Sequence, residues 1–209
     1  MKNIIAHRGY WKNKSEQNTE VAFQRALKNG FGIETDLRDR NEEIVISHDM
    51  SNSCCMTFDA FLGLCESHSG ITLALNVKSD GLQEKLLTSK VHNPHFYFDM
   101  SVPDMLSYKK HKFPFYTRFS NIETKPSLYK ESEGVWLDNF KDDTLDTNAL
   151  SLFLSDGKKV VLVSPELHKR NIKGYWESVL NFISENPEHK NQIGLCTDFP
   201  EKAREYFNE

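Results

Sequence analysis

The chain has 209 residues, of which 38% are hydrophobic and 27% are charged, and its formal net charge is −4. This length and composition predict one soluble domain over residues 1–209 with a sizeable core, and the negative charge argues against nucleic-acid binding. No run approaches the roughly 18–20 apolar residues that cross a bilayer. The first residues lack the apolar core of a secretion signal, so a cytoplasmic location is expected.

Short β-branched runs alternate with longer helical patterns along the chain. Strands are predicted at 3–6, 32–37, 44–47, 71–77, 95–98, 115–118, 134–137, 159–163 and 192–196. Helices are predicted at 19–29, 57–65, 82–88, 102–108, 144–154, 175–184 and 201–207 from the spacing of their apolar residues. Gly30 is placed to end the first of these helices.

This alternation indicates an α/β fold, with a parallel sheet covered by helices. Eight strand–helix units close into a barrel, so we expect a compact (β/α)8 TIM barrel without a cap insertion. The ninth run, 44–47, is expected to pair with 32–37 as a hairpin. An open doubly wound sheet is the alternative.

Polar side chains stand at the carboxyl ends of the predicted strands, where such folds place their sites. They are His7, Arg8, Glu34, Asp36, His48, Asn76 and Lys78, followed later by Asp99, Arg118, Asp138 and Asp198. Glu34 and Asp36 point to the same side of a strand. Two such carboxylates repel each other unless a cation lies between them, and a hard divalent metal ion suits them. The alternative is an exposed pair bonded to Arg38 or Arg40.

His7 and His48 are candidates for proton transfer, because imidazole titrates near neutral pH. Arg8 and Lys78 are candidates for phosphate binding, since their cationic groups match phosphate oxygens. A structural hydrogen bond at a strand end is the alternative for either histidine alone. These residue types together favour hydrolysis or transesterification of a phosphate ester.

Four short motifs occur in order along residues 3–49. They are Ile5-Ala6-His7-Arg8-Gly9, Gln17-Asn18-Thr19, Ile33-Glu34-Thr35-Asp36 and Ser47-His48-Asp49. In order and spacing they resemble the glycerophosphodiester phosphodiesterase family, and the segment 196–200 is similar to that family's last strand and turn. The resemblance implies a TIM barrel that hydrolyses a phosphodiester next to an alcohol such as glycerol, a reaction of lipid metabolism.

The same resemblance implies roles for individual residues. His7 and His48 would act as acid and base, and Glu34 and Asp36 would bind the metal. Arg8 would hold the phosphate, and Asn18 of the second motif would contribute to substrate binding. Mg²⁺, Ca²⁺ and Mn²⁺ all suit oxygen ligands, so the sequence does not choose among them.

Three departures from the family pattern affect this interpretation. Asn76 stands where the family has a third metal-binding carboxylate, in a Glu-x-Lys pattern that reads Asn76-Val77-Lys78 here. Gln17 replaces the family's glutamate. The segment after Asp49 is short, which predicts an open cleft that admits a glycan phosphodiester. The alternative is a barrel that binds a phosphorylated ligand with little or no turnover.

Other residues are weaker candidates. Trp136 lies near Asp138 and is predicted to stack on a sugar ring, with core packing as the alternative. Five further histidines lack carboxylate partners at informative spacing and are interpreted as surface or structural: His92, His95, His111, His168 and His189. The four cysteines suggest no disulfide framework, and the sequence sets no oligomeric state.

Overall fold

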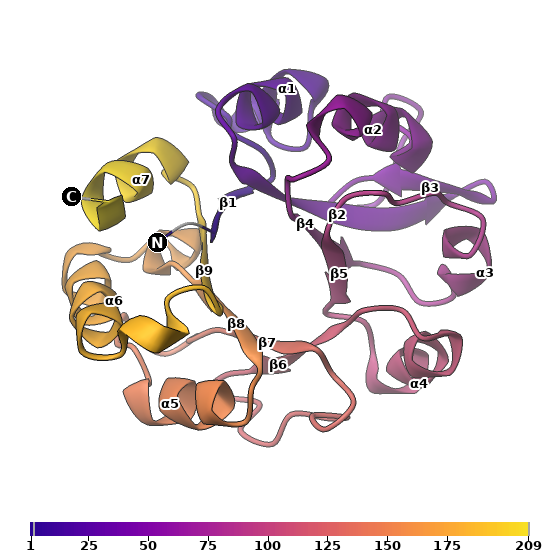
Figure 1. Ribbon diagram of the computed structural model, residues 1–209. Helices are drawn as coiled ribbons and strands as arrows, with labels where there is room; N and C mark the ends of the chain where they lie inside the picture. Colours follow the sequence, from indigo (N-terminus) through magenta and orange to yellow (C-terminus); the bar gives the residue numbers. More distant parts are fainter. Residues whose placement is uncertain (2, 209) are drawn as a thin grey trace. The chain divides into compact units, whose positions relative to one another are not determined.

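The computed structural model describes residues 1 and 3–208, and strands alternate with helices along the chain (Figure 1). The strands are β1 (Asn3–His7), β2 (Gly32–Arg40), β3 (Glu43–Ile46), β4 (Leu73–Val77), β5 (His95–Phe98), β6 (Tyr116–Phe119), β7 (Gly134–Leu137), β8 (Lys159–Val163) and β9 (Ile193–Thr197). The α-helices are α1 (Glu20–Lys28), α2 (Phe58–Cys65), α3 (Gln83–Leu86), α4 (Val102–His111), α5 (Thr147–Ser155), α6 (Lys173–Glu185) and α7 (Pro200–Asn208). Short 3-10 turns are η1 (Lys14–Glu16), η2 (Glu66–His68), η3 (Pro165–His168) and η4 (Pro187–His189).

The strands are ordered β5-β4-β2-β1-β9-β8-β7-β6. Strands that follow one another in the chain are neighbours in this order, except that β3 pairs only with β2, and β5 and β6 are the two end strands. A parallel bridge between Tyr97 and Phe115 joins β5 to the residue before β6. A doubly wound sheet would reverse its order at a switch point, so this order confirms the predicted (β/α)8 class.

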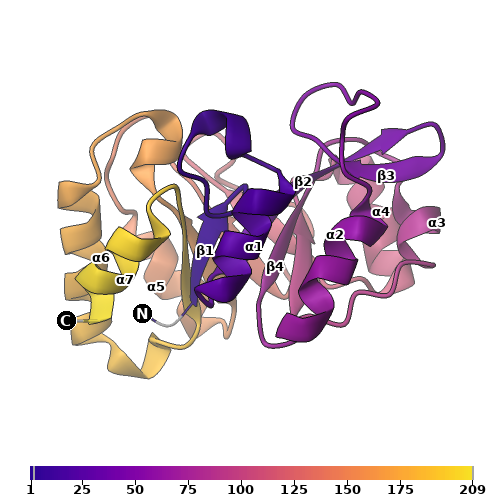
Figure 2. The same ribbon diagram turned by 90° about the horizontal axis from the view of Figure 1, so that it is seen from above.

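The packing divides the chain into two compact units, and the border falls within β1. One unit comprises residues 6–115 and the other comprises residues 1–5 with 116–209. In the 6–115 unit, β2, β4 and β5 are parallel, and helices α1 and α2 lie side by side (Figure 2). Phe23 of α1 meets Phe61 of α2 edge to face, with ring centroids 4.7 Å apart. The single domain predicted over residues 1–209 stays a prediction.

In the other unit, strands β6 to β9 pair in parallel. Trp176 of α6 is 1% exposed and packs against Phe207 of α7, with ring centroids 5.5 Å apart. Its indole N–H donates to the Ser164 hydroxyl at 2.8 Å, which satisfies the buried polar atom. This contact fixes α6 against the end of β8.

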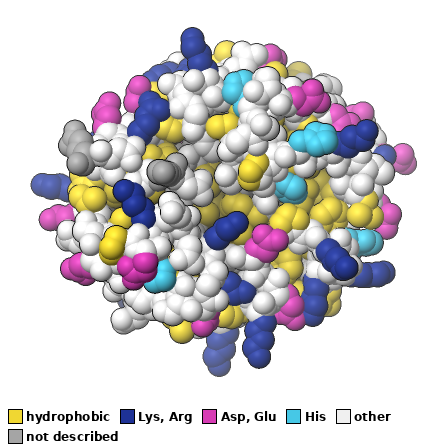
Figure 3. All heavy atoms as spheres, viewed as in Figure 1, with side chains coloured by type: hydrophobic (Ala, Val, Ile, Leu, Met, Phe, Trp, Pro, Cys, Tyr) yellow, Lys and Arg dark blue, Asp and Glu magenta, His cyan; other side chains and the backbone are white. Residues whose placement is uncertain are grey.

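The predicted hairpin is confirmed, but β2 is longer than expected. It continues to Arg40 because its last residues pair antiparallel with β3, from Leu37 with Ile46 to Arg40 with Glu43. Residues 47–57, between β3 and α2, include no helix or strand, which agrees with the expected lack of a cap insertion. No helix among the described residues is long and apolar enough to span a membrane. On the face shown in Figure 3, basic and acidic side chains are interspersed.

Candidate active site

The two carboxylates of β2 are buried. Glu34 and Asp36 are each 1% exposed, and they share one face of the strand because they are two residues apart. This burial rules out the alternative of an exposed acidic pair bonded to nearby arginines. Arg38 instead donates to the carbonyl of His48 at 3.1 Å, and Arg40 donates to backbone carbonyls of the loop after β3.

Three side chains contact the Asp36 carboxylate. Lys78 Nζ lies 3.4 Å from Asp36 Oδ1, and Arg8 Nε lies 3.3 Å from Oδ2. Arg8 Nε makes no hydrogen bond there, so its contact with Asp36 is an ion pair only. Asn18 Nδ2 donates to Asp36 Oδ2 at 2.8 Å, while Asn18 Oδ1 accepts the Thr35 hydroxyl at 2.8 Å. A buried carboxylate needs such partners, because an unpaired buried charge is strongly destabilising.

Glu34 is held mainly by backbone and imidazole. The Arg8 backbone N–H donates to Glu34 Oε2 at 3.0 Å, and His7 Nε2 lies 4.0 Å from the same oxygen. Burial raises the pKa of Glu34 to about 7, with a further contribution from the Asp36 charge. The nearby cationic side chains, with His7 the largest, act in the opposite direction. This end of the sheet therefore combines two carboxylates with cationic and titratable groups.

The turn after β1 explains the His-Arg-Gly motif. Arg8 has φ 57° and Gly9 has φ 82°, a left-handed region that glycine adopts easily and other residues rarely. A Cβ on Gly9 would lie 2.9 Å from Ala22 Cβ and 3.0 Å from the Ala22 carbonyl carbon, so α1 leaves no room for a side chain. The turn aims the Arg8 N–H at Glu34, and the Arg8 carbonyl accepts the Asn18 N–H at 3.0 Å.

Asn76 lies beside Asp36 in the register of β2 and β4. It is 7% exposed, and its buried Oδ1 has no hydrogen-bond partner among the residues that the structure describes. Such an unsatisfied oxygen costs about 1–3 kcal/mol. Residues 1 and 3–208 hold no group of three His, Cys, Asp or Glu side chains suited to a metal. Glu34 and Asp36 with the Asn76 amide oxygen would supply three oxygen donors, and such an all-oxygen set fits a hard divalent cation.

His48 stands at the end of β3, on the same edge. The Ser47 N–H donates to the Asp36 carbonyl at 3.0 Å, which ties this segment to β2. The His48 side chain is 41% exposed, and its Nδ1 lies 2.9 Å from Asp49 Oδ1. A neutral His48 that donates from Nδ1 to Asp49 leaves Nε2 as a proton acceptor.

A cavity of about 720 Å³ adjoins this group, within the 6–115 unit. Its walls are the β1–α1 connection, the loop after β3 and the first turn of α2. Its lining mixes polar and apolar side chains. The polar ones, besides Arg8, Asn18 and His48, include Lys14, Gln17, Glu20, Ser47, Asn52 and Thr57.

The structure brings together most of the predicted site residues. Of the residues given a role, the 6–115 unit contains all except Trp136, which lies on β7 in the other unit and is 4% exposed. The further strand-end candidates Arg118, Asp138 and Asp198 also lie in that other unit. The sequence interpretation missed a partner for one histidine. His168 Nε2 lies 2.7 Å from Asp138 Oδ1, across 30 residues of chain. No local spacing signals a contact between two strand-end segments so far apart.

Comparisons with known proteins identify solved structures that share this fold. No family model matches the chain, and no curated protein matches it. The solved structure of a glycerophosphodiester phosphodiesterase from Parabacteroides distasonis superposes with a TM-score of 0.71 at 17% identity, covering 99% of this chain and 96% of that one. A Ca²⁺-dependent phosphatidylinositol-specific phospholipase C from Streptomyces antibioticus gives a TM-score of 0.61 at 10% identity, covering 98% and 95%.

The chain is thus a (β/α)8 barrel protein. Within that class it has the fold of glycerophosphodiester phosphodiesterases over nearly its whole length, which is the resemblance that its N-terminal motifs predict.

Proposed function

We propose that this chain is a metal-dependent phosphodiesterase that cleaves the phosphodiester of an alcohol. The main observation in support is the buried pair Glu34 and Asp36 at the carboxyl end of the sheet. His7, Arg8 and Lys78 contact this pair. The fold it shares with known phosphodiesterases supports this reaction class. Glu34, Asp36 and Asn76 are the residues that would hold a divalent cation, which when bound supplies positive charge to a phosphoryl oxygen.

Arg8 and Lys78 provide the phosphate contacts in this proposal. Both now pair with Asp36 and are about one-fifth exposed, at 20% and 22%. Each side chain therefore keeps part of its surface exposed to solvent. A phosphate group is the other natural partner of such cations, and the Arg8 guanidinium suits two of its oxygens at once.

The two histidines divide the proton transfers. In this proposal His7, whose Nε2 lies 4.0 Å from Glu34 Oε2, is the acid that protonates the leaving alcohol oxygen. His48 Nδ1 contacts Asp49, and in the neutral tautomer that donates from Nδ1, Nε2 is free to accept a proton. His48 is therefore proposed as the base that deprotonates the nucleophile. The nucleophile is water or a hydroxyl of the substrate itself.

The adjoining cavity favours a large, hydroxylated alcohol portion. Its volume of about 720 Å³ lies within the ~300–1,000 Å³ range of ligand pockets, and its walls carry many amide and hydroxyl groups. A glycan phosphodiester uses this space better than glycerophosphocholine, the small lipid-derived alternative. We therefore place a sugar-bearing alcohol in this cavity.

Hydrolysis assays test the proposal. Bis(p-nitrophenyl) phosphate and glycerophosphocholine are incubated with the protein in EDTA, Mg²⁺, Ca²⁺ or Mn²⁺, beside His7→Ala and His48→Ala. His92→Ala, at an exposed position, is the matched control. We expect metal-dependent turnover in wild type and control, and its loss in both site variants. Turnover that survives in His7→Ala and His48→Ala, or that EDTA does not affect, would contradict the proposal.

A second function has one specific observation in its favour. Asp36 already has Lys78, Arg8 and Asn18 as partners. The negative charge of this carboxylate is therefore balanced by side chains of the chain itself. A barrel with this arrangement binds a phosphorylated ligand without turning it over. Absence of hydrolysis with every metal, together with calorimetric binding of glycerol phosphate that Lys78→Ala removes, would favour this binding function.

A further inference from the structure

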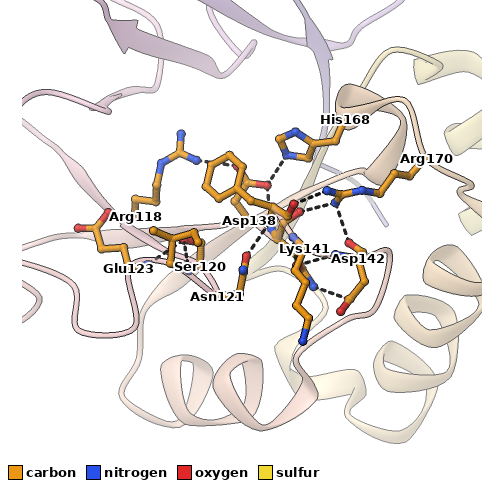
Figure 4. Close-up of polar contacts among 12 residues, drawn as sticks. Arg118, Ser120, Asn121, Glu123, Asp138, Lys141, Asp142, His168 and Arg170 are labelled. Carbon is orange, nitrogen blue, oxygen red and sulfur yellow. Dashed lines mark hydrogen bonds and ion pairs between the residues drawn. The ribbon is translucent and has the colours of Figure 1, made fainter.

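A second polar cluster lies in the unit formed by residues 1–5 and 116–209 (Figure 4). Asp138, at the end of β7, is 7% exposed and holds two side chains from neighbouring segments. Arg118 Nη1 of β6 lies 2.6 Å from Asp138 Oδ2, and His168 Nε2 of η3 lies 2.7 Å from Oδ1. The Asn139 N–H also donates to Oδ1, at 2.8 Å.

The contacts of Asp138 fix what this cluster presents to solvent. Both carboxylate oxygens are engaged, so Asp138 acts by positioning Arg118 and His168. Arg118 and Asp138 form an ion pair, so their opposite charges offset each other. His168 Nδ1 has no hydrogen-bond partner in the part of the chain that the structure describes, and its side chain is 24% exposed. The cluster therefore offers a neutral hydrogen-bonding edge.

Phe140 stands against this edge as an aromatic platform. Its ring centroid lies 5.3 Å from the Arg118 guanidinium carbon and 5.1 Å from the His168 ring centroid, yet Phe140 is 42% exposed. An exposed aromatic ring is normally mobile, but this one is carried by a well-bonded loop. The Phe140 N–H donates to Asn121 Oδ1 at 2.7 Å. The Arg170 guanidinium donates to three backbone carbonyls of residues 139–142 (Figure 4).

We propose that Phe140, Arg118 and His168 form a binding site for the pyranose ring of a neutral saccharide. The apolar C–H face of the ring packs on Phe140, while sugar hydroxyls bond to His168 Nδ1 and the Arg118 guanidinium. The small cavity lined by Asp138, Asn139 and Tyr175 has about 90 Å³, room for about three waters of ~30 Å³ each. A pyranose ring does not fit into this cavity, so we place it on the exposed Phe140 ring. This inference deepens the proposed function, since a glycan phosphodiester carries such rings.

Saturation-transfer NMR with phosphate-free sugars tests the site. The probes are the methyl pyranosides of glucose, galactose, mannose and N-acetylglucosamine, each mixed with the full-length protein. We expect transfer to the ring C–H protons of at least one probe and a loss of affinity of about tenfold in Phe140→Ala, the size of one aromatic contact. Phe199→Ala is the control, because Phe199 is 44% exposed and belongs to the same unit.

The outcomes separate this site from the proposed hydrolysis. Sugar binding that persists in His7→Ala, but not in Phe140→Ala or His168→Ala, supports the proposal whether or not the chain cleaves phosphodiesters. No transfer to any of the four pyranosides would overturn it. Equal transfer in wild type and Phe140→Ala would also overturn it, as would an equal loss in the Phe199→Ala control.

Discussion

At the scale of single residues, Gly9 meets two structural demands at once. Its φ of 82° is one that a side chain disfavours, and a Cβ would lie within 3.0 Å of Ala22. We expect Gly9→Ala to destabilise the fold by about 2–4 kcal/mol, from about 1 kcal/mol of backbone strain and about 1–3 kcal/mol of overpacking. Urea unfolding measures this difference.

Gly30 supplies the matched control for Gly9. It has φ 73°, but a Cβ there meets no atom within 4 Å. Gly30→Ala should therefore show only the backbone cost, about 1 kcal/mol. Equal losses of stability in the two variants would mean that the close contact of Gly9 with α1 does not affect the free energy of unfolding.

Asn76 gives a second residue-scale prediction. Replacing its amide by a carboxylate adds a charged oxygen donor beside Asp36, so Asn76→Glu should bind Ca²⁺ or Mg²⁺ about tenfold more tightly, which corresponds to 1.4 kcal/mol. Asn76→Ala, which removes the oxygen, should bind more weakly than wild type. Titration calorimetry measures both changes. No gain in affinity for the glutamate variant would remove Asn76 from the metal ligands.

Sequence reasoning works at this scale where one local motif carries the chemistry. The spacing of Glu34 and Asp36 on one strand is enough to predict that they share a face. The pairing of His168 with Asp138 depends instead on the closeness of η3 and β7, and Phe140 becomes a platform only through bonds from Asn121 and Arg170. Such contacts join residues too far apart for any local pattern to reveal.

At the scale of secondary-structure elements, the half-buried Glu166 of η3 bonds to the end of β9. Glu166 Oε1 accepts the Asp198 N–H at 3.0 Å and the Thr197 hydroxyl, while its buried Oε2 has no partner in the described chain. Burial raises the pKa of Glu166 above its ordinary value, although these hydrogen bonds oppose the shift.

The sign of that shift predicts how stability depends on pH. A carboxyl whose pKa is raised on folding stabilises the fold below its unfolded pKa of about 4.5, and this contribution is lost as pH rises through the folded pKa. Glu166→Gln should therefore gain stability relative to wild type as pH rises from about 4 to about 8. Urea unfolding across this range measures the difference, and a constant difference would refute the interpretation.

The order and type of the elements follow from periodicity, whereas their exact lengths do not. The predicted strand at 32–37 becomes β2, which extends to Arg40 because β3 offers an antiparallel partner. The strand predicted from residue 71 begins at Leu73, where pairing with His95 of β5 starts. Where a strand begins and ends depends on its pairing with the neighbouring strand. The apolar pattern of a single segment carries no information about that pairing.

At the scale of the whole molecule, strand β1 belongs to both compact units. Ile5 falls in one and Ala6 in the other, so unfolding either unit breaks this strand. Each unit also holds one buried thiol, Cys65 in α2 and Cys196 in β9. Burial raises the pKa of the Cys65 thiol to about 12, which keeps it unreactive in the folded chain.

The two buried thiols test whether the chain unfolds as one domain. We expect Cys65 and Cys196 to become reactive toward a thiol reagent at the same urea concentration, because loss of β1 disrupts both units. Cys54 is exposed and should react without urea, which provides the internal control. Clearly different midpoints for Cys65 and Cys196 would show two domains in place of the single one predicted.

The shared strand also determines how the chain could be rearranged. The Met1 amino group donates to the Phe207 carbonyl at 3.1 Å, so a short linker would suffice to connect the region of Phe207 to Met1. A circular permutant that begins at Tyr116 and ends at Phe115 would read residues 116–209, then 1–5, then 6–115. Each compact unit would then be an uninterrupted stretch of chain, and the order of synthesis on the ribosome would match the order of the units.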